Sequence, residues 1–205
     1  MDSPRQERSA PDVPPEARAL LDQASVGYLG LTQGDDGYPV VVPVNFAWLD
    51  GDVLVHGSLE GEKMRALARD DRATFAVAVE YSLIPSHFGD ESDACAASQY
   101  FVSVVAHGRA QLVEAPREKA DALAALMAKL QPEGRYRPIS ADDQTYAAAL
   151  DGTAVIRIAV EALSTRVKLG QQLSPERREG IIAGLAERGR PLDLQTVEAM
   201  RRAAG

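Results

Sequence analysis

The stretch YPVVVPVNFAWLDGDVLVHGSLEGEKMRAL, which runs from Tyr38 to Leu67, carries the pattern that decides the fold. It contains two apolar runs, Val40–Trp48 and Val53–Gly57, which are separated by the pair Asp50-Gly51. Apolar runs of this length are typical of strands, and an Asp-Gly pair between them favours a tight turn. The stretch therefore predicts a β-hairpin.

The residues after the hairpin favour a binding site for an anion. The run Gly57-Ser58-Leu59-Glu60-Gly61-Glu62-Lys63 leaves the second strand and opens a short helix at about Gly61. Free backbone N–H groups and the helix dipole both attract a phosphate at such a helix start, and Lys63 adds a compact positive charge. The segment predicts a phosphorylated cofactor or substrate, although Lys63 read alone is equally consistent with a solvated lysine.

Composition narrows the class of protein. The 205 residues suffice for one hydrophobic core with a small helical appendage. The chain lacks an apolar run long enough to span a membrane and an apolar signal segment at its N-terminus, so we expect a cytoplasmic protein without a membrane partner. The net charge of −8 makes nucleic acid an unexpected partner. The single cysteine, Cys95, excludes an internal disulfide.

The remaining chain predicts several more strands, with helices between them and without a β–α–β alternation. We expect strands at Val26–Thr32, Val40–Trp48, Val53–Gly57, Thr74–Val79, Phe101–Val113, Val155–Val160 and Arg166–Leu169. This order predicts a mainly β protein with helices (α+β), built on an antiparallel sheet or barrel of about six strands.

Three parts of different character follow one another along the chain. Residues 1–13 are polar and Pro-rich, and we expect them to be mobile. Residues 14–170 are expected to form the main domain, and residues 171–205 a helical tail that begins with Ser174 as N-cap and Pro175 in the first turn. The irregular segment Tyr81–Ser98 lies inside the main domain, and structureless segments of that length are often functional.

Asn45 is the first candidate for a binding residue. It shares one face of its strand with Pro43, and proline cannot donate a hydrogen bond to a neighbouring strand. The sheet should therefore be locally open there, and an amide beside an open strand suits a planar heterocycle that needs hydrogen bonds. The alternative is an asparagine whose amide is satisfied by a neighbouring loop.

Histidines are the other candidates for chemistry. His56 ends the second strand of the hairpin, beside the predicted phosphate loop. At this position a functional role and a structural role are about equally expected. His87 and His107 lie far apart in sequence, and the three histidines fit no standard spacing of metal ligands. We therefore expect no metal site, and Cys95 is interpreted as an ordinary thiol.

Taken in order, these motifs resemble the flavin-binding split barrels of the pyridoxamine-phosphate oxidase superfamily, and most of all its nitroimidazole-resistance (Nim-type) proteins. Tyr38–Leu67 resembles the front half of that barrel, and Ser103–Glu114 resembles its long strand. Arg137–Asp143 and Thr153–Val160 resemble its C-terminal part. The resemblance covers about Pro14–Lys168.

This resemblance implies a six-stranded antiparallel split β-barrel that forms a homodimer with FMN at the subunit interface. The isoalloxazine ring would lie along one strand, the ribityl phosphate would lie at the loop behind the hairpin, and the long strand would approach the cofactor through a serine. His56 would lie close to the cofactor and act in catalysis. The residues so implied are, for the ring, Pro43, Val44, Asn45 and Phe46; for the phosphate side, His56, Gly57, Ser58 and Lys63; and for the long strand, Ser103.

Two features depart from that family's pattern. Its members often carry a basic residue just before the serine of the long strand, and this chain has Val102 there. The segment from Lys168 to Leu185 resembles the tail of another flavin-binding group, the PaiB-like transcriptional regulators. That second resemblance implies that Lys168 and Gln171 reach the cofactor, across the dimer.

The resulting expectation is an FMN-dependent oxidoreductase that acts on a small molecule, with a nitro compound as the concrete candidate and His56 as proton donor. One alternative is a flavin-binding sensor or regulatory protein without turnover. The other is a haem-binding protein, because three histidines are available as ligands.

Overall fold

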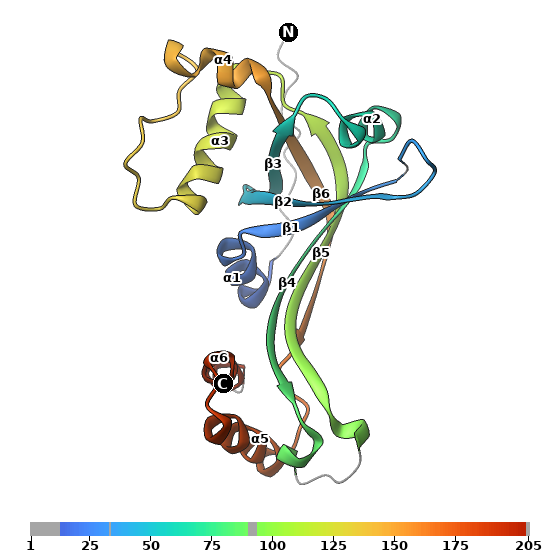
Figure 1. The fold of residues 1–205 in the computed structure, drawn as a ribbon, viewed down its shortest axis with the longest axis vertical. Helices are drawn as coiled ribbons and strands as arrows, with labels where there is room; N and C mark the ends of the chain where they lie inside the picture. The colour runs from blue at the N-terminus through green and yellow to red at the C-terminus, as the bar shows by residue number, and fades with distance from the viewer. Residues whose placement is uncertain (1–12, 33, 90–93, 204–205) are drawn as a thin grey trace. The chain divides into compact units, whose positions relative to one another are not determined.

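The structure is a computed structural model that describes residues 13–32, 34–89 and 94–203 (Figure 1). The segment expected to be mobile, residues 1–13, lies outside the described residues except for Val13. The helices are α1 Pro15–Gln23, α2 Glu62–Arg69, α3 Pro116–Leu130, α4 Gln144–Gly152, α5 Pro175–Arg188 and α6 Pro191–Arg202, with short 3₁₀ turns η1 Ser86–Gly89 and η2 Ala94–Ala96. The strands are β1 Val26–Leu31, β2 Val40–Leu49, β3 Asp52–Ser58, β4 Arg72–Ile84, β5 Ser98–Leu112 and β6 Thr153–Lys168.

The six strands form a closed barrel in the order β1-β2-β3-β6-β5-β4. The β1–β2, β1–β4, β2–β3 and β3–β6 pairs are antiparallel. The predicted hairpin is confirmed, because Leu49 pairs with Asp52 across a turn in which Asp50 and Gly51 have positive φ angles of 52° and 85°. A tight hairpin turn needs that backbone conformation, which Asp and Gly adopt more readily than other residues. The expected mainly β fold with an antiparallel barrel is thus confirmed.

Two of the predicted strand boundaries are wrong. The residues expected to form separate strands at Val155–Val160 and Arg166–Leu169 belong to one continuous strand, β6. Strand β4 continues to Ile84, five residues past its predicted end; its alternation of buried and exposed residues breaks at residues 78–80, which are exposed, and resumes beyond them. The buried positions in that extension are Ser82 and Ile84, and the polar side chain of Ser82 hides the alternation in the sequence.

Aromatic and aliphatic side chains fill the barrel. The rings of Phe46 on β2 and Phe75 on β4 are fully buried, with centroids 4.7 Å apart in a tilted arrangement. Trp48, Val53 and Val55 are also buried. Such packing of large apolar groups supplies most of the favourable free energy of a small barrel.

Helix α3 covers part of the outer surface of the barrel (Figure 1). Ala122 and Leu126 of α3 pack on Ala47, Leu54 and Val155, which come from β2, β3 and β6. All five side chains are nearly inaccessible to solvent. We call this group, together with Val113, the covered outer face.

The chain divides into two compact units, and β4, β5 and β6 contribute to both. The first unit comprises the residues up to Val77 together with Val105–Ser164, and it contains α1 to α4. The second comprises Ala78–Val104 and the residues from Thr165 onward, including α5 and α6. The sequence-based division at residue 170 stays a prediction.

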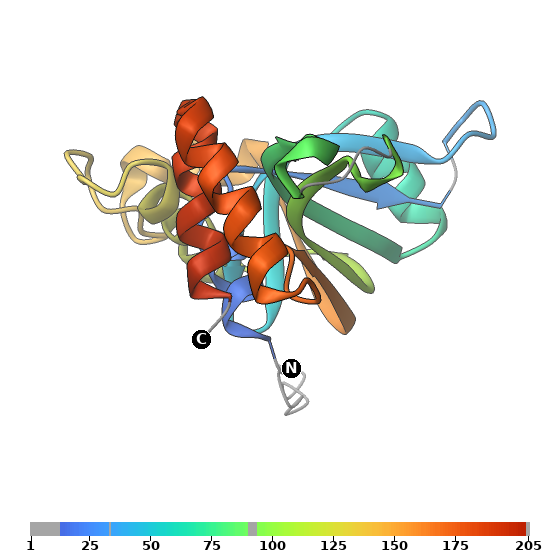
Figure 2. The ribbon, with the colours of Figure 1, turned by 90° about the horizontal axis from the view of Figure 1, so that it is seen from below.

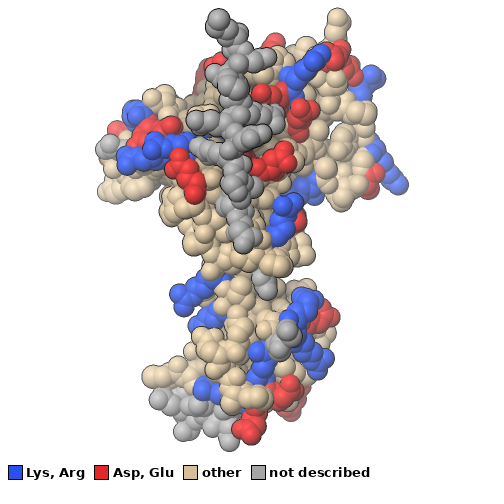
Figure 3. All heavy atoms as spheres, turned by 180° about the vertical axis from the view of Figure 1, so that it is seen from behind, with Lys and Arg blue, Asp and Glu red and all other residues tan. Residues whose placement is uncertain are grey.

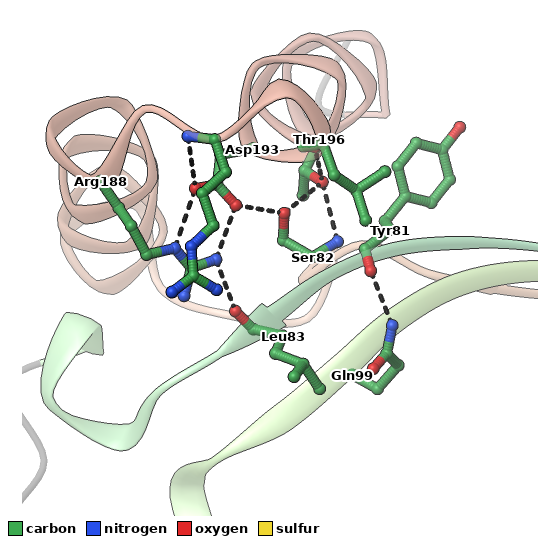
Figure 4. Close-up of polar contacts among 9 residues, drawn as sticks. Tyr81, Ser82, Leu83, Gln99, Arg188, Asp193 and Thr196 are labelled. Carbon is green, nitrogen blue, oxygen red and sulfur yellow. Dashed lines mark hydrogen bonds and ion pairs between the residues drawn. The ribbon is translucent and has the colours of Figure 1, made fainter.

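The predicted helical tail is confirmed as two neighbouring helices, α5 and α6 (Figure 2). Ser174 caps α5 by accepting a hydrogen bond from the Arg177 N–H, and Pro175 occupies the first turn, as the sequence predicts. Within the second unit, a buried polar cluster fixes α6 to β4 (Figure 4). Its members are Ser82, Arg188, Asp193 and Thr196.

The side chains of that cluster bond one another and the backbone of β4. The Ser82 hydroxyl donates to Asp193 at 2.6 Å, and the Ser82 N–H donates to the Thr196 hydroxyl at 2.9 Å. The Arg188 guanidinium donates to both carboxylate oxygens of Asp193 and to the Leu83 carbonyl. These charge-assisted bonds, chiefly those from Arg188, lower the pKa of Asp193. The cluster therefore anchors the tail.

Candidate functional site

The candidate site lies where β2 changes its hydrogen-bonding partner. Residues Val40–Asn45 pair with β1, whereas the pairing between β2 and β3 runs only from Phe46 to Leu49. On the far side of β3, His56, Gly57 and Ser58 continue to pair with β6. Within the described residues, β2 and β3 thus separate beyond Phe46, as the position of Pro43 predicted.

The four strand residues implied to line a flavin ring differ in what they present. Pro43 and Asn45 are exposed, Val44 is half-buried, and Phe46 is 0% exposed. The Asn45 amide nitrogen donates a hydrogen bond to the Ser25 carbonyl at 2.9 Å. For that atom, the alternative of an asparagine satisfied by a neighbouring loop therefore applies. Because the Phe46 ring packs inside the barrel, only its backbone is available to a ligand.

The phosphate-side residues lie on two faces of β3. His56 and Ser58 are exposed and share one face, since alternate residues of a strand point the same way. Gly57 faces the other way, and the Lys63 ammonium lies 2.5 Å from the point that a Cβ of Gly57 would occupy. The structure therefore brings Lys63 to Gly57, on the side opposite His56. Burial lowers the pKa of Lys63.

The start of α2 has the features expected of an anion site. Gly61 stands at the N-cap position with φ 107° and ψ 178°, a conformation open essentially only to glycine, and no side chain caps the helix. A Cβ at Gly61 would meet no atom within 4 Å, so the space in front of the helix is open. The Ser58 hydroxyl accepts a hydrogen bond from the Glu60 N–H at 3.1 Å and so shapes the loop.

Two arginines fix α2 against the loop between β1 and β2. Arg65 and Arg69 bind the two carboxylate oxygens of Asp35 at 2.6 Å and 2.5 Å. Arg69, and to a smaller extent Arg65, holds the pKa of Asp35 below its ordinary value. This tether positions the helix start beside the end of β3.

Three further predicted residues, Ser103, Lys168 and Gln171, belong to the second unit. Ser103 and Lys168 are half-buried on β5 and β6. The Gln171 side chain accepts from the Leu169 N–H at 2.8 Å and donates to the Val167 carbonyl at 3.1 Å, so it stabilises the turn after β6. A role of these residues in binding stays a prediction.

Val102, which replaces an expected basic residue, is 4% exposed. It occupies a buried position in the alternation of β5. A charged side chain at this position of the alternation would carry a large desolvation penalty. The departure from the family pattern is therefore consistent with the local packing.

Sequence reasoning missed Lys129 of α3. Its ammonium lies 3.5 Å from the centroid of the Phe46 ring and donates to the Leu21 carbonyl at 2.8 Å. Burial lowers its pKa to about 8. Lys129 thus joins α1 and α3 to the point at which β2 changes partner. A lysine near the end of an amphipathic helix carries no sequence signal for such a contact.

The three histidines occupy different settings. His56 is exposed on β3, and His107 of β5 shares a hydrogen bond of 3.0 Å with the Thr74 hydroxyl. His87 belongs to the second unit, where its ring meets Phe88 edge-on. Among the residues that the structure describes, no group of three His, Cys, Asp or Glu side chains is arranged to hold a metal ion. No described helix is both long and apolar enough to cross a membrane.

A six-stranded antiparallel barrel that splits between two hairpin strands, with a helix start at the split, defines the class of split-barrel proteins. The model of the pyridoxamine 5'-phosphate oxidase family matches residues 14–167. The chain therefore belongs to this family, as the sequence resemblance predicted. No curated protein matches the chain.

Three solved structures illustrate the similarity. The flavocytochrome Anf3 of Azotobacter vinelandii is 26% identical over 79% of this chain and 70% of its own, with a TM-score of 0.62. The FAD and heme binding protein of Mycobacterium smegmatis is 22% identical over 84% and 79%, with a TM-score of 0.62. A candidate 5-nitroimidazole antibiotic resistance protein of Bacteroides thetaiotaomicron is 22% identical over 72% and 80%, with a TM-score of 0.58. The last two comparisons support the shared fold.

Proposed function

We propose that this protein is an FMN-binding flavoprotein and an oxidoreductase that acts on a small molecule. The observation that carries the proposal is the end of the β2–β3 register at Phe46, beside the loop from Gly57 to Lys63. Membership of the pyridoxamine 5'-phosphate oxidase family and the 26% identity to a flavocytochrome support it.

The residues present fit a flavin with a phosphate. The uncapped start of α2, with Gly61 opening onto free space, offers backbone N–H groups and the positive end of a helix dipole to the phosphate. Lys63 contributes a half-buried positive charge at Gly57. The backbone of β2 from Pro43 to Asn45, which has left β3, offers hydrogen-bonding groups along the edge of a planar ring.

The bound flavin would supply electron transfer. The chain's own residues would then orient the substrate and provide a proton. His56, exposed on the outer face of β3, is the proposed proton donor to a small acceptor such as a nitro compound. Exposed Pro43 would exclude water from one side of the ring.

We further propose that the protein is a homodimer with the cofactor at its interface. An apolar part of the outer barrel surface has no cover from the described residues of this chain; its members are Val26, Tyr28, Val41 and Pro43, and we call it the uncovered outer face. Tyr28 is 54% exposed and Val41 is 62% exposed. Contiguous exposed apolar surface of this kind marks an interaction site. Ser103 is proposed to approach the cofactor from the long strand, and Lys168 and Gln171 are proposed to reach it across the dimer.

The absorption spectrum of protein purified without added cofactor tests the flavin proposal. The two broad bands of an oxidised flavin, with FMN identified after release, are the expected result. Release of FAD in place of FMN would correct the identity of the cofactor, but the protein would still be a flavoprotein. A colourless protein that also fails to take up added FMN would overturn the proposal.

A second candidate function is a haem- or flavin-binding sensor without turnover, which the similarity to a flavocytochrome favours. A haem protein would show a sharp Soret band and would lose it when the ligating histidine is replaced. A sensor would hold a flavin that no nicotinamide reductant turns over. Regulation through nucleic acid is less favoured, because basic and acidic side chains are intermixed on the face in Figure 3 and the chain carries a net charge of −8.

A further inference from the structure

The Lys129 ammonium of α3 lies in surroundings that disfavour its charge. It contacts the face of the Phe46 ring and the Leu21 carbonyl, and among the described residues it forms no ion pair with a carboxylate. Asp22 acts on it through space, but that carboxylate is already bonded to Arg18 at 3.0 Å. A ring and one carbonyl replace only part of the hydration that a half-buried ammonium loses. The charged form is therefore disfavoured, in agreement with the lowered pKa of Lys129.

The neutral amine can keep both contacts of the ammonium. A lysine ammonium has three N–H donors, whereas the neutral amine has two and a lone pair. Two N–H groups suffice for the Leu21 carbonyl and the face of the Phe46 ring. The lone pair then takes the third direction, in which the described residues supply no hydrogen-bond partner. Because the Lys129 side chain is half-buried rather than enclosed, a small reagent can reach it from solvent.

The other lysines lack this combination of contacts. The chain has four lysines, all of them described: Lys63, Lys119, Lys129 and Lys168. Lys119 also donates to a carbonyl, that of Leu150 at 2.9 Å, but among the described residues no aromatic ring contacts its ammonium. Burial also lowers the pKa of Lys63, whose ammonium lies against Gly57. Only the Lys129 ammonium lies between an aromatic face and a carbonyl.

We propose that Lys129 is a site of acylation by small acyl phosphates, with the acyl amide taking the place of the ammonium between the Phe46 ring and the Leu21 carbonyl. The neutral amine nitrogen attacks the acyl carbon, and the bond from that carbon to the phosphate oxygen breaks. Inorganic phosphate leaves with the electron pair, and the amine proton passes to solvent. Desolvation makes a lysine a nucleophile near neutral pH, because it raises the share of the neutral amine.

The amide product suits these surroundings better than the ammonium does. It carries no charge to desolvate, and it keeps one N–H for the Leu21 carbonyl. The methyl group of an acetyl amide is apolar, as is the Phe46 ring beside it. Acylation therefore turns a charged contact between α1, α3 and β2 into a neutral one. The reaction needs no flavin, so this inference stands apart from the proposed function.

The test is acetylation of the full chain by acetyl phosphate, followed at each lysine by mass spectrometry of peptides cleaved after arginine. At about pH 7.5, Lys129 should react about tenfold faster than Lys119 and Lys168. Its rate should rise with pH to a plateau, with a midpoint at the pKa of about 8. Lys63 is followed separately, because its protection by added FMN reports on the flavin proposal and leaves the result at Lys129 unchanged.

Two controls separate the environment of Lys129 from its local sequence. In denaturing urea the contacts with Phe46 and Leu21 are lost, and the rates at Lys119, Lys129 and Lys168 should agree within about twofold. Lys129→Arg keeps a positive charge but removes the amine, and it should leave the native rates at Lys119 and Lys168 unchanged. The proposal would be overturned by a native rate at Lys129 no higher than at those two lysines, by a preference that persists in urea, or by a rate without a midpoint near pH 8.

Discussion

The covered and uncovered outer faces of the barrel share strand β2 but differ in their exposure to solvent. Near the end of β2, Ala47 is 4% exposed beneath Leu126 of α3. Nearer its start, Val41 on the same side of the strand is 62% exposed. A small residue lies where a helix packs closely, and larger apolar residues lie where the described chain supplies no cover. The comparison indicates that the barrel completes its own packing on one side and leaves the other side to a ligand or a partner.

The largest expected effect comes from the covered face. Leu126→Ala removes a buried side chain between α3 and the barrel and should lower the free energy of unfolding by about 3 kcal/mol. Val41→Ala, on the uncovered face, should change it by less than about 0.5 kcal/mol in the monomer. Urea denaturation at one fixed protein concentration measures both. Equal costs for the two variants would mean that both faces are covered in the free chain.

A charge on the uncovered face should break the proposed dimer. Tyr28→Glu places a carboxylate in the apolar centre of the face, where a two-fold interface would bring it close to its copy. The dimer dissociation constant should rise by about 100-fold, measured by sedimentation equilibrium. Leu194→Glu, at a residue of similar exposure on α6, is the matched control and should have no effect. A dimer that tolerates Tyr28→Glu would place the interface elsewhere.

The loop behind β3 should matter for cofactor affinity more than the histidine beside it. Lys63→Ala removes the half-buried charge at Gly57 and should weaken FMN binding by about tenfold. His56→Ala should keep most of the affinity and lose activity instead. Flavin fluorescence titration measures the first quantity, and reduction of a nitro compound measures the second. The opposite pattern, with affinity lost only in His56→Ala, would contradict the proposed roles and favour His56 as a cofactor ligand.

The fold could be read from the sequence because local signals agree with it. Three local signals act on their nearest neighbours: the Asp50-Gly51 turn, the proline at position 43 and the capping Ser174. The hairpin turn, the opening of the strand and the helix cap lie where these signals predict them. The extension of β4 was missed because Ser82 is buried by contacts with α6, more than a hundred residues away along the chain.

The same limit applies to the candidate site. The Gly57–Lys63 loop is a local motif, so the proximity of Lys63 to Gly57 could be predicted from the sequence. That Lys63 lies on the face opposite His56, and that Lys129 covers Phe46, depend on how α2 and α3 pack on the barrel. Helix packing of this kind leaves no mark in a strand's pattern of apolar residues.

Lys129 lies at the boundary between the two faces, and its titration should give the smallest of the predicted effects. Because burial lowers its pKa to about 8, the folded protein releases this proton between about pH 8 and 10.5, where the unfolded chain still holds it. The unfolded state then binds more protons, so this residue makes stability rise with pH across that window. Its partial exposure to solvent limits the gain to on the order of 1 kcal/mol.

Lys129→Met keeps the length of the side chain and its contact with Phe46 while removing the titrating group. The measurement is the difference in unfolding free energy between about pH 7.5 and 9.5, for wild type and variant. Wild type should gain stability relative to Lys129→Met over that interval, because only wild type sheds the buried charge. A relative loss in wild type would mean that the attraction of the ammonium to the Phe46 ring and the Leu21 carbonyl outweighs the cost of its burial. In that case the boundary between the two faces is held by a charge, and alkaline pH should loosen α3 from the strand that leads to the proposed flavin site.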